Sequence, residues 1–243
     1  MTFKLRYKSL GLHAVLVEWP AEISEAVLED VLVLKAKIEN SHIKEIIQVT
    51  FAYSSLVVFY VNLFISLDER IAIIDKIYSS KSNAVSLISH LWKIPVCYDE
   101  VFGLDLNTIA NEKKVSKEDV IKQHCEAIYT VYFIGFLPGF LYLGGLDESL
   151  HIPRKSTPRL QVEKGAVAIG GNQTGIYSNE SPGGWNIIGN SPLNFFDVSK
   201  EKPCFAKVGD RVQFYPISLK TYKNIKTLVE AGVYQLESEN VND

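Results

Sequence analysis

One stretch decides the fold of this chain: residues Tyr132–Asp197 read YFIGFLPGFLYLGGLDESLHIPRKSTPRLQVEKGAVAIGGNQTGIYSNESPGGWNIIGNSPLNFFD. Most of the chain's 15 glycines and five of its nine prolines fall inside it. These two residue types set special backbone angles, whereas the aromatic and branched apolar residues between them favour strands. The pattern predicts short strands joined by ordered loops, and loops on a rigid scaffold are where binding groups usually lie.

Outward from this stretch, the pattern predicts strands at both of its ends and within it. They are Thr130–Ile134, Val167–Ile169, Asn186–Ile188, Asn194–Phe196 and Arg211–Tyr215. Many short strands with few helices are typical of a closed or nearly closed β-barrel. Before the barrel we expect a short helix over 105–111 and a second helix to about 127, which Ser116 caps together with Asp119. Residues 220–231 are helical or extended, and the polar tail after 236 is expected to fray.

The residues before this region follow a different order. Strands are predicted at 12–19, 42–51 and 56–62, helices from Ser24 and from Asp68, and a further strand near 94–98. This β-α-β-β-α-β order is that of a ferredoxin-like split βαβ unit. We therefore predict an α+β chain with two domains. The first, residues 1–93, is a small ferredoxin-like α/β domain, and the second, residues 94–243, is the β-barrel domain.

Composition and charge exclude several functional classes. The content of 47% hydrophobic and 22% charged residues is ordinary for a soluble globular protein. A net charge of −3 supplies no basic field for nucleic acid or an anionic membrane, and no apolar run reaches the roughly 18 residues that span a bilayer. Cys97, Cys125 and Cys204 are widely spaced, form no metal-binding pattern and indicate a reducing compartment. We expect a cytoplasmic protein with neither a metal site nor a nucleic-acid or membrane partner.

Two arginines flank a stiff turn, because prolines precede both Arg154 and Arg159. Two guanidinium groups on such a loop are able to hold a carboxylate or a phosphate through paired hydrogen bonds. The structural alternative is that both arginines face solvent or pair with Glu148, Glu163 or Glu180. The spacing of the residues does not decide between these interpretations.

The run Gly170–Tyr177 offers backbone amides together with the side chains of Gln173, Thr174 and Tyr177. Such a loop is able to cradle an anion or an oxyanion, although a tight β-turn is the simpler interpretation. It is neither a phosphate-binding loop of the Gly-Lys-Ser/Thr type nor a dinucleotide fingerprint, because no Gly-Lys-Ser/Thr and no long helix follow it.

The pentad that contains Ser181, Gly183, Gly184 and Trp185 is the most unusual motif of the chain. Its tryptophan either packs in the core or forms the wall of a pocket. His124, on the helix before the barrel, is a candidate as well, although a single histidine there is more often structural. The motifs GxSxG and HExxH are absent, so the sequence identifies no catalytic residue.

Several segments together resemble one family. They are Ile94–Tyr98, Gly135–Leu143, Pro153-Arg154 with Pro158-Arg159, Gly175–Tyr177 and Ser181–Gly189. The family is that of the B subunit of 5-oxoprolinase, which also contains the KipI-type sporulation kinase inhibitors and is related to allophanate hydrolase subunit 1. The likeness covers nearly the whole chain, is dense over residues 94–217, and rests mainly on the combination of GFLPGF with SPGGWNIIG.

The resemblance implies a cyclophilin-like β-barrel as the second domain. It also implies two partners, the KipA-like C subunit and the A subunit of 5-oxoprolinase, with which this chain opens the lactam of 5-oxo-L-proline to L-glutamate using ATP. Mg²⁺ is expected with the ATP, and no tightly bound cofactor is expected. Arg154, Arg159 and the 171–175 loop would then bind a carboxylate or a phosphorylated intermediate, and Pro138 and Tyr142 of the GFLPGFLYL run are further candidates.

The chain departs from the family pattern at Asn190-Ser191-Pro192, where the family usually has Arg-Thr-Pro. This departure concerns the substrate more than the fold. Two alternatives to the oxoprolinase remain, a KipI-type inhibitor that binds a histidine kinase and a subunit of an allophanate- or urea-type amide hydrolase. A prolyl isomerase ranks last, because a shared barrel does not carry function.

Overall fold

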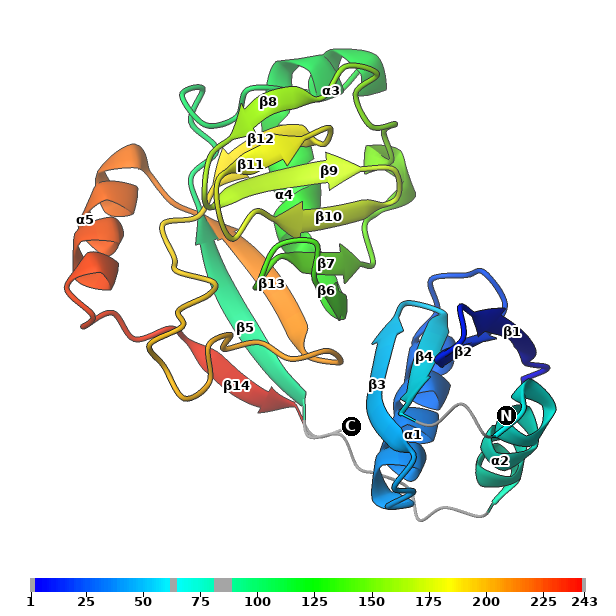
Figure 1. Ribbon diagram of the computed structural model, residues 1–243. Coiled ribbons are helices and arrows are strands. Elements are labelled where there is room, and N and C mark those ends of the chain that lie inside the picture. Colours follow the sequence, from blue (N-terminus) through cyan, green and yellow to red (C-terminus); the bar gives the residue numbers. More distant parts are fainter. Residues whose placement is uncertain (1–2, 62–64, 81–88, 242–243) are drawn as a thin grey trace. The chain divides into compact units, whose positions relative to one another are not determined.

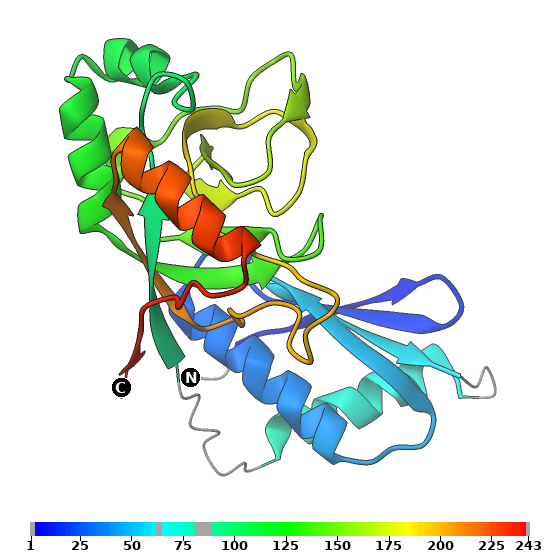
Figure 2. The ribbon, with the colours of Figure 1, turned by 90° about the vertical axis from the view of Figure 1, so that its left-hand side faces the viewer.

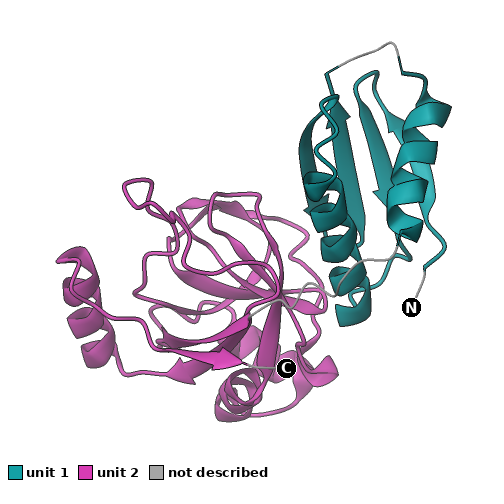
Figure 3. Ribbon diagram, turned by 90° about the horizontal axis from the view of Figure 1, so that it is seen from below, with its two compact units in different colours: residues 1–87 teal, residues 88–243 magenta. Residues whose placement is uncertain are grey.

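The computed structural model describes residues 3–61, 65–80 and 89–241 of the chain (Figure 1). It divides into two compact units, Met1–Leu87 and Ile88–Asp243 (Figure 3). The boundary expected between residues 93 and 94 falls inside strand β5 (Ser89–Val96), all of which belongs to the second unit. Within the described ranges, no helix is both long and apolar enough to cross a membrane.

In the first unit, four antiparallel strands form one sheet in the order β1-β2-β4-β3. The elements are β1 (Arg6–Leu10), β2 (Ala14–Glu18), α1 (Glu25–Asn40), β3 (Ile46–Ala52), β4 (Ser55–Tyr60) and α2 (Leu67–Ser79). Val27, Val31 and Leu34 of α1 lie in the core, as their helical spacing predicts. The ferredoxin-like order is not confirmed, because the strand near residues 94–98 that would complete it belongs to β5 in the second unit, and the sheet contains β1 in its place.

The second unit contains an eight-stranded sheet in the order β12-β9-β10-β7-β6-β13-β5-β14, and β11 pairs with β8 in a separate ribbon. The elements after β5 are α3 (Leu106–Lys113), α4 (Lys117–Glu126), β6 (Ile128–Ile134), β7 (Leu141–Gly144), η1 (Glu148–Leu150), β8 (Arg159–Val162), β9 (Ala166–Gly170), β10 (Gln173–Ile176), β11 (Ser181–Gly183), β12 (Asn186–Asn190), β13 (Arg211–Pro216), α5 (Leu219–Glu230) and β14 (Ser238–Val241). Figure 1 shows α5 set apart from the strands, beyond the loop that connects β12 to β13.

The predicted β-barrel is not closed. β12 and β14 are the two edges of the sheet, and no strand pair in the described part of the chain joins them. The end of β5 is linked to β12 by one isolated bridge, in which the amides of Cys97 and Asn190 each donate to the other residue's carbonyl at 2.9 and 3.0 Å. Closure is incomplete because β5 pairs with the C-terminal strand β14 along the edge where a closed barrel would continue.

Two further predictions for the second unit are wrong. Asn194–Phe196 is not a strand, because Phe195 is fully buried and packs with its ring 5.6 Å from that of Phe205, so core packing holds this segment. The tail is not frayed up to residue 241, since β14 pairs with β5 and Lys93 forms ion pairs with Glu237 and Glu239 at 3.0 and 2.6 Å. A polar composition is compatible with an edge strand, because its side chains face solvent.

The two predicted helix starts at Ser24 and Ser116 differ in their capping. At the start of α4, Ser116 accepts a hydrogen bond from the amide of Asp119 at 3.0 Å, and the Asp119 carboxylate accepts one from the Ser116 amide at 3.2 Å. The predicted capping box is therefore confirmed. Ser24 precedes α1 as predicted, but its side chain makes no capping hydrogen bond in the described structure.

Candidate functional site

The two arginines of the 153–159 loop have different environments. Arg159 donates two hydrogen bonds to the carboxylate of Asp105, at 2.7 and 2.8 Å, and Lys155 donates a third at 2.9 Å. The backbone amide of Ile187 donates a fourth at 2.8 Å. Asp105 immediately precedes α3, and only 2% of its surface is exposed. Arg159 therefore anchors the loop to α3 and β12, and its partner is none of the three glutamates that the sequence left open.

The charge balance around Asp105 favours the carboxylate. Burial raises the pKa of Asp105, but the hydrogen bonds from Arg159, Lys155 and the Ile187 amide outweigh that effect, and the pKa lies below its ordinary value. Two cations next to one anion leave a net positive charge at the base of the loop. Sequence reasoning missed Asp105, because 54 residues separate it from Arg159 and no motif connects them.

Arg154, in contrast, is exposed and stacks on an aromatic ring. Its guanidinium carbon lies 5.4 Å from the centre of the Trp185 ring, which is a cation–π contact. No carboxylate within the described ranges forms an ion pair with it. Burial raises the pKa of both Tyr142 and Tyr177, and the charge of Arg154 partly offsets this for each hydroxyl. Arg154 is thus the cation of the loop that remains available to an anionic ligand.

Beside Arg154 lies an aromatic wall, formed by Phe140, Tyr142, Tyr177 and Trp185. The ring centre of Phe140 is 4.5 Å from that of Tyr142, 5.0 Å from that of Tyr177 and 5.7 Å from that of Trp185. Trp185 is 5% exposed, so it is a core residue whose ring also supports Arg154. The two interpretations of this tryptophan are therefore not exclusive.

The glycines of this region make room for the aromatic wall. A Cβ atom at Gly170 would lie 2.6 Å from the indole of Trp185, and one at Gly183 would lie 2.2 Å from the hydroxyl oxygen of Tyr177. Gly184 is different, because a Cβ atom there would have its nearest neighbour at 3.6 Å, an ordinary contact. Close packing against the aromatic rings therefore explains Gly170 and Gly183.

We expect Gly170→Ala to lower the free energy of unfolding by about 2 kcal/mol, because the added methyl group overpacks a buried indole ring. Gly184→Ala is the matched control and is expected to change it by less than about 0.5 kcal/mol, since the site has space. Denaturant unfolding followed by circular dichroism measures both values. Equal effects of the two substitutions would contradict the packing argument.

The glycine-rich run is a hairpin, and only its turn is a loop. Gly171, with φ of +70°, occupies the turn between β9 and β10, while Gln173 and Thr174 lie in β10 with 8% and 0% of their surfaces exposed. Ser181 is 8% exposed at the start of β11, and its hydroxyl lies 3.1 Å from the carbonyl of Pro182. These three side chains are therefore buried, unlike that of Arg154.

Pro138 lies on the surface, in the turn between β6 and β7. In the same turn, Phe136 is 65% exposed and has a φ of +69°, a left-handed conformation that an aromatic residue rarely adopts. The ring of Phe136 meets that of Phe140 edge-on, with their centres 6.0 Å apart. The GFLPGF turn thus borders the aromatic wall and brings Pro138 to the same part of the unit.

His124 is an interior residue with two hydrogen-bond partners. Its Nδ1 lies 2.8 Å from the Tyr98 hydroxyl and its Nε2 lies 2.9 Å from Thr174 Oγ1. Thr174 Oγ1 donates to the carbonyl of Ala168, so it accepts a hydrogen bond from Nε2 of a neutral ring whose Nδ1 accepts from Tyr98. Burial lowers the pKa of His124 to about 3. The histidine therefore joins α4 to β10, and its place in the core favours the structural interpretation.

The lowered pKa of His124 predicts acid sensitivity. The unfolded chain binds a proton near the ordinary pKa of 6.5, whereas the folded chain resists it, so stability is complete above pH 6.5 and decreases as the pH falls toward 3. We expect a loss of about 2 kcal/mol between pH 7.5 and pH 5, from one proton over about 1.5 pH units. Urea unfolding at a series of pH values measures it. The decrease should be smaller in His124→Gln and unchanged in the control His151→Gln.

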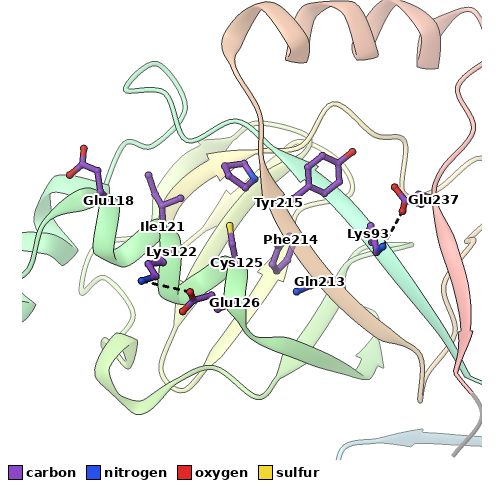
Figure 4. A pocket seen from close by; sticks show the side chains of 11 residues that line it. Lys93, Glu118, Ile121, Lys122, Cys125, Glu126, Gln213, Phe214, Tyr215 and Glu237 are labelled. Carbon is purple, nitrogen blue, oxygen red and sulfur yellow. Dashed lines mark hydrogen bonds and ion pairs between the residues drawn. The ribbon is translucent and has the colours of Figure 1, made fainter.

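A cavity of the second unit lies elsewhere, along α4 and β13 (Figure 4). This groove has a volume of about 870 Å³ and contains none of the site residues predicted from the sequence. Its charged residues partly neutralise one another, with Lys93 3.0 Å from Glu237 and Lys122 3.9 Å from Glu126. Burial raises the pKa of the Cys125 thiol in this groove, which disfavours the reactive thiolate.

Comparison with known proteins identifies the family of this chain. The model of the family described as carboxyltransferase domain, subdomain C and D, matches residues 5–206. The chain is 35% identical over 243 residues to the B subunit of 5-oxoprolinase from Bacillus subtilis (strain 168), covering 93% of this chain and 98% of that protein. The chain belongs to the family of 5-oxoprolinase B subunits.

Solved structures share this fold. A conserved uncharacterized protein from Pyrococcus horikoshii is 40% identical, with a TM-score of 0.53, over 89% of this chain and 100% of that chain. Urea carboxylase from Kluyveromyces lactis has a TM-score of 0.83 over 98% of this chain, at 19% identity. This chain spans 24% of the length of the urea carboxylase, and the likeness to it shows a shared fold alone.

Proposed function

We propose that this chain is the B subunit of an ATP-dependent 5-oxoprolinase, which opens 5-oxo-L-proline to L-glutamate. The observation that carries the proposal is the 35% identity to a 5-oxoprolinase B subunit across 98% of that protein's length. The site supports it, because an exposed arginine next to an aromatic wall suits a small ring that bears a carboxylate. The finer fold assignments, ferredoxin-like and cyclophilin-like, remain part of the proposal.

In this proposal, Arg154 binds the substrate carboxylate and Tyr142, the partly exposed ring of the aromatic wall, contacts the ring carbons. A lactam amide is stable, so the γ-phosphoryl group of ATP would transfer to the amide oxygen, with ADP as the leaving group. One water then adds to the activated carbon and the carbon–nitrogen bond breaks, which leaves γ-glutamyl phosphate. A second water hydrolyses this acyl phosphate to L-glutamate and phosphate. Mg²⁺ would accompany the ATP, as in other phosphoryl transfers.

The relatives are named as one subunit of a larger enzyme, which supports the expectation of partners. We propose a heteromer with the KipA-like C subunit and the A subunit of 5-oxoprolinase. The test is ATP-dependent release of L-glutamate from 5-oxo-L-proline by the three proteins together, compared with mixtures that each omit one of the three. Activity that disappears without this chain supports the proposal, and full activity without it would refute the proposal.

Three expectations stay predictions. They are the cytoplasmic location, the KipI-type inhibition of a histidine kinase and the action on an allophanate- or urea-type amide. The last two have direct tests, which are binding to a purified histidine kinase without the C subunit and amide release by the complete mixture with allophanate or urea as the substrate. Tight kinase binding, together with an inert three-subunit mixture, would favour the inhibitor.

A further inference from the structure

A second cavity, of about 650 Å³, lies in the part of the second unit that contains α5. Its walls come from α5, from the loop between β12 and β13, from the segment after α5 and from β5. Figures 1 and 2 show that this loop runs between α5 and the strands. The volume lies within the range of about 300 to 1,000 Å³ that small-molecule sites usually have. The aromatic wall and Arg154 do not line it.

Aromatic side chains form a large part of the lining. Trp92, Phe205, Tyr222 and Tyr234 all face this cavity. Trp92 is fixed in orientation, because its indole Nε1 donates to Asp210 at 2.8 Å and its ring meets that of Phe205 edge-on at 5.0 Å. Positioned aromatic rings of this kind are suited to stacking against a planar heterocycle.

Positive charge is gathered at the same cavity. Three lysines line it, Lys164, Lys200 and Lys226, against two acidic residues, Asp197 and Glu230. The Asp197 carboxylate already accepts hydrogen bonds from the amide and the hydroxyl of Ser199 at 3.0 and 2.7 Å. All three lysines are exposed, and the ammonium group of Lys164 donates to Asn194 Oδ1 at 2.9 Å. The lining charge is therefore positive by one unit, which favours an anionic ligand.

A buried hydroxyl adds a second indication of a ligand. Ser191 lines the cavity and is 2% exposed, and its Oγ has no hydrogen-bond partner among the residues that the structure describes. A buried polar group without a partner is costly and calls for an explanation. A ligand that forms a hydrogen bond with this hydroxyl would explain its burial.

We propose that this cavity binds an adenine nucleotide, with the base against the aromatic rings and the phosphates at Lys164, Lys200 and Lys226. The aromatic lining, the three lysines and the unpartnered Ser191 together match a ligand that joins a planar heterocycle to several negative charges. The inference rests on the proposed function for the choice of ATP. It places a nucleotide site on this subunit apart from Arg154, so this site is distinct from the place where the lactam is phosphorylated.

Isothermal titration calorimetry of this protein alone with ATP and Mg²⁺ tests the inference. We expect binding that competes with adenosine and with tripolyphosphate, because each carries one half of the recognised chemistry. Lys226→Met and Lys200→Met should each weaken ATP binding by about tenfold, as expected for one charged contact. Lys223→Met, on the same helix but outside the cavity lining, is the matched control and should leave the affinity unchanged.

Ser191→Ala separates a ligand contact from a structural role. It should weaken ATP binding without lowering the unfolding midpoint, because the hydroxyl that it removes has no partner in the described structure. Absence of ATP binding at about 1 mM ligand, or binding that none of these variants weakens, would overturn the inference. If the three-subunit mixture still needs this chain for activity, the proposed function survives that outcome.

Discussion

Asp105→Ala is expected to lower the free energy of unfolding of the second unit by about 3 kcal/mol, because it removes a buried charge on which three groups converge. The side chain is 3% exposed and accepts hydrogen bonds from Arg159, Lys155 and the Ile187 amide. Without the carboxylate, two cations face each other and a buried amide loses its acceptor. Urea unfolding at pH 7.5, followed by circular dichroism, measures the loss.

The control for Asp105 is Glu100→Ala, a nearby carboxylate that is 79% exposed and pairs with Lys117 at 2.8 Å. A surface pair of this kind contributes less than about 1 kcal/mol, so this variant should unfold almost as the wild type does. The pair Asp105→Asn and Arg159→Gln, measured singly and together, then gives the coupling energy directly. Equal losses for Asp105→Ala and Glu100→Ala would show that Asp105 does not anchor the loop.

The sequence predicts the features that depend on residues close together in the chain. Ser116 and Asp119 lie three residues apart, so their capping box is readable, and the spacing of Val27, Val31 and Leu34 specifies the buried face of α1. Long-range pairing is not readable in this way. Nothing in the composition of the tail indicates that β14 pairs with β5, because that contact depends on a strand about 150 residues earlier in the chain.

The candidate site shows the same limit. Arg154 and Arg159 occupy equivalent positions in the sequence, each directly after a proline, and both are candidates for an anion clamp on that basis. The structure separates them, because Asp105 approaches from α3 and neutralises Arg159 while Arg154 stacks on Trp185. His124 and Thr174 are likewise brought together across 50 residues, in the core. The types of residue are predictable, and their roles require the tertiary contacts.

Arg154→Ala is expected to reduce kcat/KM for 5-oxo-L-proline by about 100-fold in the three-subunit mixture, mostly through a higher KM, as the loss of one charge-assisted contact predicts. Its unfolding free energy should change by less than about 0.5 kcal/mol, because the side chain is exposed. The kcat/KM of Arg154→Lys should lie between those of the wild type and Arg154→Ala, since lysine keeps the charge and lacks the planar fork.

Arg6→Ala, an exposed arginine of β1 in the first unit, controls for the loss of one positive charge and should keep full activity. The two arginines of the loop are then told apart by their effects. Substituting Arg154 lowers kcat/KM at unchanged stability, whereas substituting Arg159 lowers the free energy of unfolding, as Asp105→Ala does. This contrast follows from burial, because a guanidinium held by a buried carboxylate stabilises the fold, whereas an exposed guanidinium is available to bind. Full activity of Arg154→Ala, in a mixture that requires this chain, would place the substrate carboxylate at another cation.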